Sequence, residues 1–189
     1  SVTCTDCLAG SFQSQPGQAT CSPCPRGTVT AVGGQSECQA CARGLFANAT
    51  GMLTCLRCDL GSVQPLSGQS ACALYSPGTF IGSTGQSVCQ ACQPGRASAL
   101  NGTIGCTDCI QGYFQDQPGQ AVCKQCSAGF FNPSFGQPSC QPCAAGRYTG
   151  ALNSTVCLDC DPGRHQTLLG SLSAKLACLA DSRLHHGRP

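Results

Sequence analysis

Cysteine is the residue with the most reactive chemistry in this chain, and it recurs at a fixed spacing. The 189 residues contain 20 cysteines, so cysteine exceeds one residue in ten. The first cysteine of each repeat falls every 17 residues, at Cys4, Cys21, Cys38, Cys55, Cys72, Cys89, Cys106, Cys123, Cys140 and Cys157. A second follows three residues later in nine repeats, at Cys7, Cys24, Cys41, Cys58, Cys92, Cys109, Cys126, Cys143 and Cys160. In the fifth repeat, Tyr75 takes that place.

Three kinds of chemistry use CxxC pairs: tetrahedral zinc, thiol redox catalysis and structural disulfides. Zinc would need repeats grouped in twos to supply four sulfurs per metal, and the uniform 17-residue spacing shows no such grouping. Redox catalysis needs a βαβ context that the sequence lacks. Large apolar side chains are scarce, with 7 Phe, 3 Tyr and no Trp, so burial alone would not offset the ordering entropy. We therefore expect structural disulfides, with an intracellular zinc protein as an alternative.

The spacing also limits which cysteines pair. A bond inside CxxC would close a very small loop and leave neighbouring repeats unconnected. Joining the second cysteine of one repeat to the first of the next closes the same loop of about 15 residues each time, worth about 3 kcal/mol on the chain-entropy model. The predicted pairs are Cys7–Cys21, Cys24–Cys38, Cys41–Cys55, Cys58–Cys72, Cys92–Cys106, Cys109–Cys123, Cys126–Cys140, Cys143–Cys157 and, with a longer loop, Cys160–Cys178.

Cys4 and Cys89 are left over by this pairing, and Cys89 is the one whose expected partner is Tyr75. We expect the Cys89 thiol to be buried beside Tyr75, and Cys4 to be bonded to a repeat upstream of this segment. The alternative is that Cys4 of one molecule bonds Cys89 of another and so crosslinks subunits.

Short extended segments must position these cysteines, because each repeat is punctuated by two glycines. One glycine lies three residues after the second cysteine position in all ten repeats, and another lies ten residues after it in nine. Asn153 replaces the second glycine once, and asparagine is the residue that best tolerates a left-handed backbone in its stead. Segments of three to five residues between turns favour strands over helices. The predicted fold is small and disulfide-rich, built mainly of short β-hairpins and loops as an elongated solenoid-like rod.

The repeats resemble their third neighbours most, which predicts a superperiod of 51 residues. Residues 4–20 and 106–122, six repeats apart, share 12 of 17 letters. The three Asn-x-Ser/Thr sequons also fall in every third repeat, and they predict N-glycosylation at Asn48, Asn101 and Asn153. Asn132 is excluded because Pro133 follows it.

The periodic pattern covers residues 1–165, and 166–189 form a divergent C-terminal cap or tail. Leu169, Leu172, Leu176 and Leu179 have helical spacing, so we predict a short capping helix over about 169–182. His165, His185 and His186 lie at this end and are expected to be solvated rather than metal ligands.

Charge and the other motifs exclude several classes of function. Ten basic and eight acidic residues are scattered singly, so neither a nucleic acid nor an anionic membrane is an expected partner. No apolar run reaches the roughly 18 residues of a membrane span, and no secretory signal is present. No nucleophile is grouped with a base, and we expect neither an enzyme nor a cofactor.

The motif CxxGx(F/Y) begins at the second cysteine of a CxxC pair, and another cysteine follows 14 residues after that second cysteine. This pattern resembles the ephrin-receptor-like cysteine-rich repeat. It is also similar to the first submodule of tumour-necrosis-factor-receptor cysteine-rich domains. The resemblance covers residues 4 to about 165 and implies a secreted or cell-surface location, rods of short β-hairpins and the 14-residue cysteine pairing. We expect an extracellular structural rod or fibre component that assembles with itself, head-to-tail or laterally. The alternative is a receptor or adhesion ectodomain that binds another extracellular protein.

Overall fold

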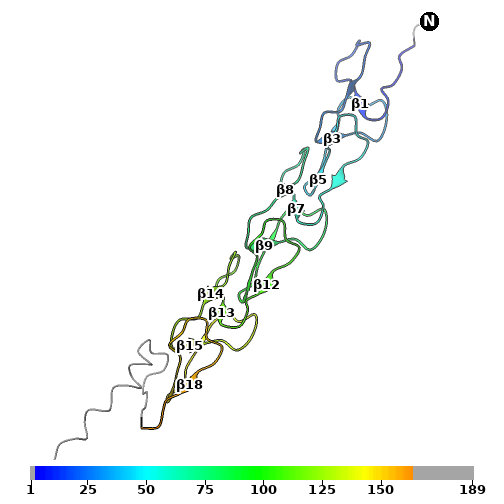
Figure 1. The fold of residues 1–189 in the computed structure, drawn as a ribbon. Coiled ribbons are helices and arrows are strands. Elements are labelled where there is room, and N and C mark those ends of the chain that lie inside the picture. Colours follow the sequence, from blue (N-terminus) through cyan, green and yellow to red (C-terminus); the bar gives the residue numbers. More distant parts are fainter. Residues whose placement is uncertain (1–2, 164–189) are drawn as a thin grey trace, which may run out of the picture. The chain divides into compact units, whose positions relative to one another are not determined.

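The computed structural model describes residues 3–163, and their regular secondary structure consists of two-residue strands (Figure 1). No helix occurs within this range. The strands are β1 (Ser11–Phe12), β2 (Ser22–Pro23), β3 (Thr28–Val29), β4 (Gln39–Ala40), β5 (Leu45–Phe46), β6 (Leu56–Arg57), β7 (Ser62–Val63), β8 (Ala73–Leu74), β9 (Thr79–Phe80), β10 (Gln90–Ala91), β11 (Arg96–Ala97), β12 (Thr107–Asp108), β13 (Tyr113–Phe114), β14 (Lys124–Gln125), β15 (Phe130–Phe131), β16 (Gln141–Pro142), β17 (Arg147–Tyr148) and β18 (Leu158–Asp159).

The chain divides into two compact bodies. Within the described residues, the first body comprises 3–90 and 100–105, and the second comprises 91–99 and 106–163. Each is built from the same hairpin. The hairpins of the first body pair β1 with β2, β3 with β4, β5 with β6 and β7 with β8, and those of the second pair β11 with β12, β13 with β14, β15 with β16 and β17 with β18.

Every hairpin crosses the boundary between two repeats. Its first strand starts directly after the turn glycine of one repeat, and its second strand is the pair of residues between the two cysteines of the next CxxC, or between Cys72 and Tyr75 in the fifth repeat. In the first hairpin Ser11 faces Pro23 and Phe12 faces Ser22 in an antiparallel register. The same register recurs in the second body, where Arg96 faces Asp108. The CxxC spacing thus supplies one strand of each hairpin, and the predicted class of short β-hairpins and loops is confirmed.

Main-chain hydrogen bonds join each repeat to the next inside both bodies. Six junctions share a pattern of three N–H donors: the turn glycine, the residue three positions after it and the second glycine of the following repeat, or Asn153 in its place. Between repeats 2 and 3 the bonds run from Gly27 N–H to the Ala47 carbonyl (2.9 Å), from Thr30 N–H to the Met52 carbonyl (3.3 Å) and from Gly51 N–H to the Cys24 carbonyl (2.8 Å). Between repeats 7 and 8 they run from Gly112 to Asn132 (2.9 Å), from Gln115 to Gln137 (3.3 Å) and from Gly136 to Cys109 (2.8 Å).

The first glycine of six repeats is required by close backbone packing as well as by its dihedral angle, whereas Gly146 and Gly163 have open space around them. Gly27 has φ +86°, and a Cβ placed on it would come within 2.1 Å of the Gly68 carbonyl oxygen, two repeats further along. At the second glycine position Asn153 has φ 59°, which confirms the left-handed turn predicted from its place in the glycine series. Glycine is therefore part of the packing between repeats.

The interior of most repeats combines a cystine sulfur with a polar side chain. The residue six positions after the second cysteine position is buried in repeats 2 to 9, and six of these eight residues are polar: Thr30, Gln64, Ser98, Gln115, Asn132 and Thr149. Apolar side chains contribute two small clusters in the first body, one around Val29 and Ala47 and one around Val63 and Ile81. The scarcity of large apolar residues in the sequence is thus matched by the absence of a continuous apolar core in the described part of the chain.

The predicted capping helix over about 169–182 lies outside the described residues, as does Cys178, the predicted partner of Cys160. His165, His185 and His186 lie outside them too.

Candidate interaction sites

Eight disulfides join consecutive repeats, and each closes a sequence separation of 14 with a Cα–Cα distance of 5.7–5.8 Å. They are Cys7–Cys21, Cys24–Cys38, Cys41–Cys55, Cys58–Cys72, Cys92–Cys106, Cys109–Cys123, Cys126–Cys140 and Cys143–Cys157. Sixteen cysteines are thereby oxidised, and the zinc alternative, which needs them as thiolates, is wrong. No group of three or more His, Cys, Asp or Glu side chains within residues 3–163 is arranged to hold a metal ion.

The two sulfurs of each disulfide lie in different environments. The cysteine that opens the loop is buried in all eight, with at most 8% of its surface exposed. The cysteine that closes the loop is half-buried or exposed in every pair except the last, where Cys157 is buried. Each repeat therefore has an inner and an outer cysteine position.

Tyr75 occupies the inner position of the fifth repeat and replaces the missing cysteine as a packing element. Its side chain is 6% exposed and contacts the apolar cluster of Val63 and Ile81. Its hydroxyl donates a hydrogen bond to the carbonyl of Thr103 in the sixth repeat. The aromatic ring and this hydrogen bond take over the inter-repeat link that a disulfide makes elsewhere.

Cys89 is a free, exposed thiol, and our expectation that it is buried beside Tyr75 is wrong. The reason is the asymmetry between the two cysteine positions, because Cys89 holds the outer one while Tyr75 holds the inner one. Cys4 is also free and exposed. The part of the chain that the structure describes thus presents two thiols to solvent, one near its start and one at the repeat that lacks a disulfide.

The three sequon asparagines differ in environment. Asn48 and Asn101 are exposed, whereas Asn153 is half-buried. The Nδ2 of Asn153 donates to the Tyr113 hydroxyl at 3.2 Å, and its Oδ1 is buried without a hydrogen-bond partner. The shared sequon pattern therefore covers two kinds of site.

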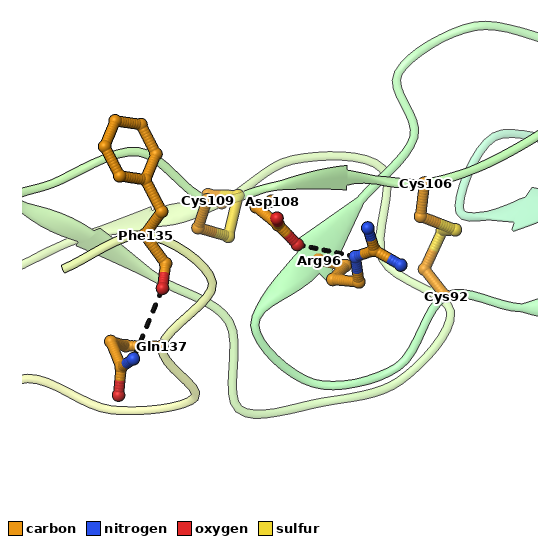
Figure 2. Close-up of polar contacts among 8 residues, drawn as sticks. Cys92, Arg96, Cys106, Asp108, Cys109, Phe135 and Gln137 are labelled. Carbon is orange, nitrogen blue, oxygen red and sulfur yellow. Dashed lines mark hydrogen bonds and ion pairs between the residues drawn. A yellow bond between two sulfur atoms is a disulfide. The ribbon is translucent and has the colours of Figure 1, made fainter.

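Ion pairs bind the exposed sides of three hairpins in the second body. Arg96 Nε lies 2.6 Å from Asp108 Oδ1, between facing residues of β11 and β12, and Arg147 and Asp159 repeat this pair 51 residues later. Figure 2 shows the Arg96 and Asp108 side chains pointing toward each other, with the Cys92–Cys106 disulfide that closes the loop carrying β11. These side chains are half exposed or more, so each pair contributes little to stability.

A third ion pair joins Lys124 Nζ to Asp116 Oδ1 at 2.5 Å. The hydrogen bond from Lys124 lowers the pKa of the Asp116 carboxyl below its ordinary value of 3.8. The lysine also lies 5.9 Å from the centre of the Phe114 ring, within cation–π range.

An open apolar hollow of about 310 Å³ lies on the same body. Small and aliphatic side chains line most of it, among them Ala97, Ile110 and Val122, and Tyr113 and the Asp108 side chain complete its wall. Ile110 and Val122 remain more than half exposed there. The hollow can accept an apolar side chain of a protein partner.

Glutamines at 51-residue intervals form a feature that the repeat analysis missed. Gln13, Gln64 and Gln115 each donate from Nε2 to the carbonyl seven residues later, at 2.5–2.7 Å. Each also accepts from the N–H two residues later, at 2.9–3.1 Å. The recurrence of Gln at one position of repeats 1, 4 and 7 was visible in the sequence, and it marks side chains that close their own loops.

Among residues 3–163, no helix has the length and apolar character needed to cross a membrane.

A family model described as "tyrosine-protein kinase ephrin type A/B receptor-like" matches residues 1–34, 95–136 and 119–160. The last two matches overlap, and together the three cover just over half of the 189 residues. No curated protein matches the chain significantly.

Proposed function

Because the chain belongs to the ephrin-receptor-like family of cysteine-rich repeats, we propose that it is a structural component of an extracellular rod or fibre. The disulfides support the extracellular location, since sixteen oxidised cysteines persist only in an oxidising compartment. This assignment requires neither a cofactor nor a catalytic residue.

The observation that carries the structural role is the regular junction between repeats. Each junction uses a disulfide or its tyrosine replacement together with main-chain hydrogen bonds, and these bonds do not depend on the identity of the exposed side chains. A repeat that contacts chiefly its near neighbours can be added without changing the others, as in solenoid proteins. Uniform repeats without loop insertions suit a load-bearing or spacing element better than a dedicated ligand site.

The exposure of the two free thiols supports self-assembly. A disulfide between Cys4 of one copy and Cys89 of another would join subunits with a fixed stagger. The two thiols lose two protons and two electrons when the S–S bond forms, and a disulfide-bearing oxidoreductase of the secretory pathway accepts both. Because the two positions differ, the contact is heterologous, and repeating it produces an open chain of subunits rather than a closed dimer.

A receptor or adhesion ectodomain is the second candidate, and the apolar hollow beside Ile110 and Val122 favours it. Exposed apolar side chains that line a hollow are typical of a protein-binding surface. On this hypothesis the chain remains monomeric and binds a partner that presents an apolar side chain.

Sedimentation of the secreted, unreduced chain tests the assembly. We expect disulfide-linked oligomers that a non-reducing gel resolves as a ladder, and a loss of that ladder in Cys89→Ser and Cys4→Ser. The double variant Cys7→Ser/Cys21→Ser serves as the control, because it removes one bonded pair of cysteines without leaving a new free thiol. A wild-type chain that stays monomeric at every concentration, and whose Cys4 and Cys89 are both found as free thiols by alkylation, would contradict the crosslink.

A further inference from the structure

The three sequons occupy unequal positions of the 17-residue repeat, although they recur in every third repeat. Counted from the first cysteine, Asn48 is the eleventh residue of its repeat, Asn101 the thirteenth and Asn153 the fourteenth. The fourteenth position is the one that glycine holds in the other repeats. Asn153 therefore occupies the turn-glycine position of its repeat, whereas Asn48 and Asn101 do not.

Asn153 is fixed by its backbone. Its φ of 59° lies in the left-handed region, and its N–H donates to the Cys126 carbonyl at 3.0 Å, as the glycines of the series do to the equivalent cysteine. Its carbonyl oxygen lies so close to Gly112 that a Cβ on that glycine would come within 2.2 Å of it. Asn153 thus completes the junction between neighbouring repeats, and its main chain has no room to shift.

The side chain of Asn153 is also engaged. Its Nδ2, the atom that carries an N-linked sugar, donates to the Tyr113 hydroxyl at 3.2 Å, and its Oδ1 is buried. The neighbouring Ser154 is held as well, since its carbonyl accepts from Asn132 N–H at 2.9 Å and its hydroxyl bonds to Thr149. A sugar on Nδ2 would require the Tyr113 ring to move and the turn to open.

The side chains of Asn48 and Asn101 have the opposite environment. Both side chains are exposed, and both residues lie in loops outside the strands. Leu100, next to Asn101, is 71% exposed, so this side of the loop faces solvent. A large, polar substituent on either Nδ2 would extend into solvent without disturbing a junction.

We infer that N-linked glycans are attached at Asn48 and Asn101 and that Asn153 stays unmodified as a turn residue in place of glycine. In the transfer, a lipid pyrophosphate-linked oligosaccharide loses its C1–O bond to the pyrophosphate, and C1 bonds to Nδ2, which gives up a proton. This inference rests on the extracellular location proposed above, because only the secretory pathway supplies that donor.

The test uses the full chain secreted from a glycosylating host. Enzymatic deglycosylation in ¹⁸O-water converts each glycosylated asparagine to labelled aspartate, and peptide mass spectrometry then reads the three positions. We expect the label at residues 48 and 101 and none at 153. Gel mobility should increase by one glycan step in Asn48→Gln and in Asn101→Gln, and it should not change in Asn153→Gly, which preserves the left-handed turn.

Label at residue 153 in the soluble secreted fraction would overturn the inference, as would a faster-migrating Asn153→Gly. Secreted chain with intact disulfides but no label at residue 48 or 101 would also overturn it, while leaving the structural role standing. A chain whose cysteines remain reduced in its native source would refute the extracellular location and this inference together.

Discussion

Replacing Tyr75 with cysteine restores the one disulfide that is missing from the ladder, and its consequence can be worked from the structure. The new sulfur would stand at the inner position, 14 residues before Cys89, where the other pairs have Cα–Cα distances of 5.7–5.8 Å. Closing a loop of about 15 residues contributes about 3 kcal/mol on the chain-entropy model. The substitution therefore adds a constraint on the unfolded chain that the wild type lacks.

The same substitution removes the buried Tyr75 ring and its hydrogen bond. Truncating a buried aromatic side chain costs about 3–5 kcal/mol, and losing the hydroxyl bond to Thr103 costs about 1 kcal/mol. The loss is thus at least as large as the gain, so Tyr75→Cys should be no more stable than the wild type. If the new disulfide were the only effect, Tyr75→Cys would be clearly more stable than the wild type. The loss of the Tyr75 ring explains why no such rise is expected.

The double variant Tyr75→Cys/Cys89→Ser separates the two effects, because it lacks the ring and cannot form the bond. Guanidinium unfolding should place it about 3 kcal/mol below oxidised Tyr75→Cys. Alkylation should find one free thiol fewer in Tyr75→Cys than in the wild type. Equal stability of the two variants, with the new bond verified by mass spectrometry, would refute the view that each disulfide of the ladder contributes to holding the repeats.

Three further perturbations test the packing and the electrostatics. Gly27→Ala places a Cβ within 2.1 Å of a carbonyl oxygen at positive φ and should lower the free energy of unfolding by more than about 2 kcal/mol. Gly105→Ala, with open space around it, should change the free energy of unfolding by less than about 0.5 kcal/mol. Similar losses in the two variants would contradict the close packing at Gly27. Gln115→Ala leaves its loop partners unpaired and should cost about 1–3 kcal/mol in urea unfolding; a neutral result would show that the buried amide is dispensable. Lys124 lowers the pKa of Asp116, so the stabilising effect of that carboxylate is complete above its ordinary pKa of 3.8 and is lost as pH falls through the lowered value. The thermal midpoints of the wild type and Asp116→Asn should therefore converge at the lowest pH. A difference between the two midpoints that persists there would exclude this ion pair as its cause.

Much of the fold could be predicted from the spacing of the cysteines and glycines. The disulfide pairing was predictable because the single 14-residue spacing repeats through the chain, and Cys89 is left unpaired because Tyr75 stands where its partner would be. The left-handed turn at Asn153 was predictable because only a few residue types tolerate that conformation. These features depend on covalent geometry and local backbone sterics, which a single sequence records directly.

The burial of individual side chains was harder to predict. The exposed position of Cys89 depends on which half of each disulfide faces inward, and the letters of a CxxC pair do not distinguish its two cysteines. The buried Gln115 is a polar residue that sequence reasoning places at the surface, and only the loop that it closes explains its burial. The unequal sequons have the same origin, because the motif encodes recognition of the asparagine and not the hydrogen bond that Asn153 makes with Tyr113.

Electron microscopy of the native secreted chain, purified without reductant, tests the proposed structural role most directly. The proposal predicts filaments that contain many copies of the chain and that shorten when the exposed thiols are removed by Cys4→Ser or Cys89→Ser. Single-chain particles in the native preparation, with both thiols free, would contradict it and favour the receptor hypothesis.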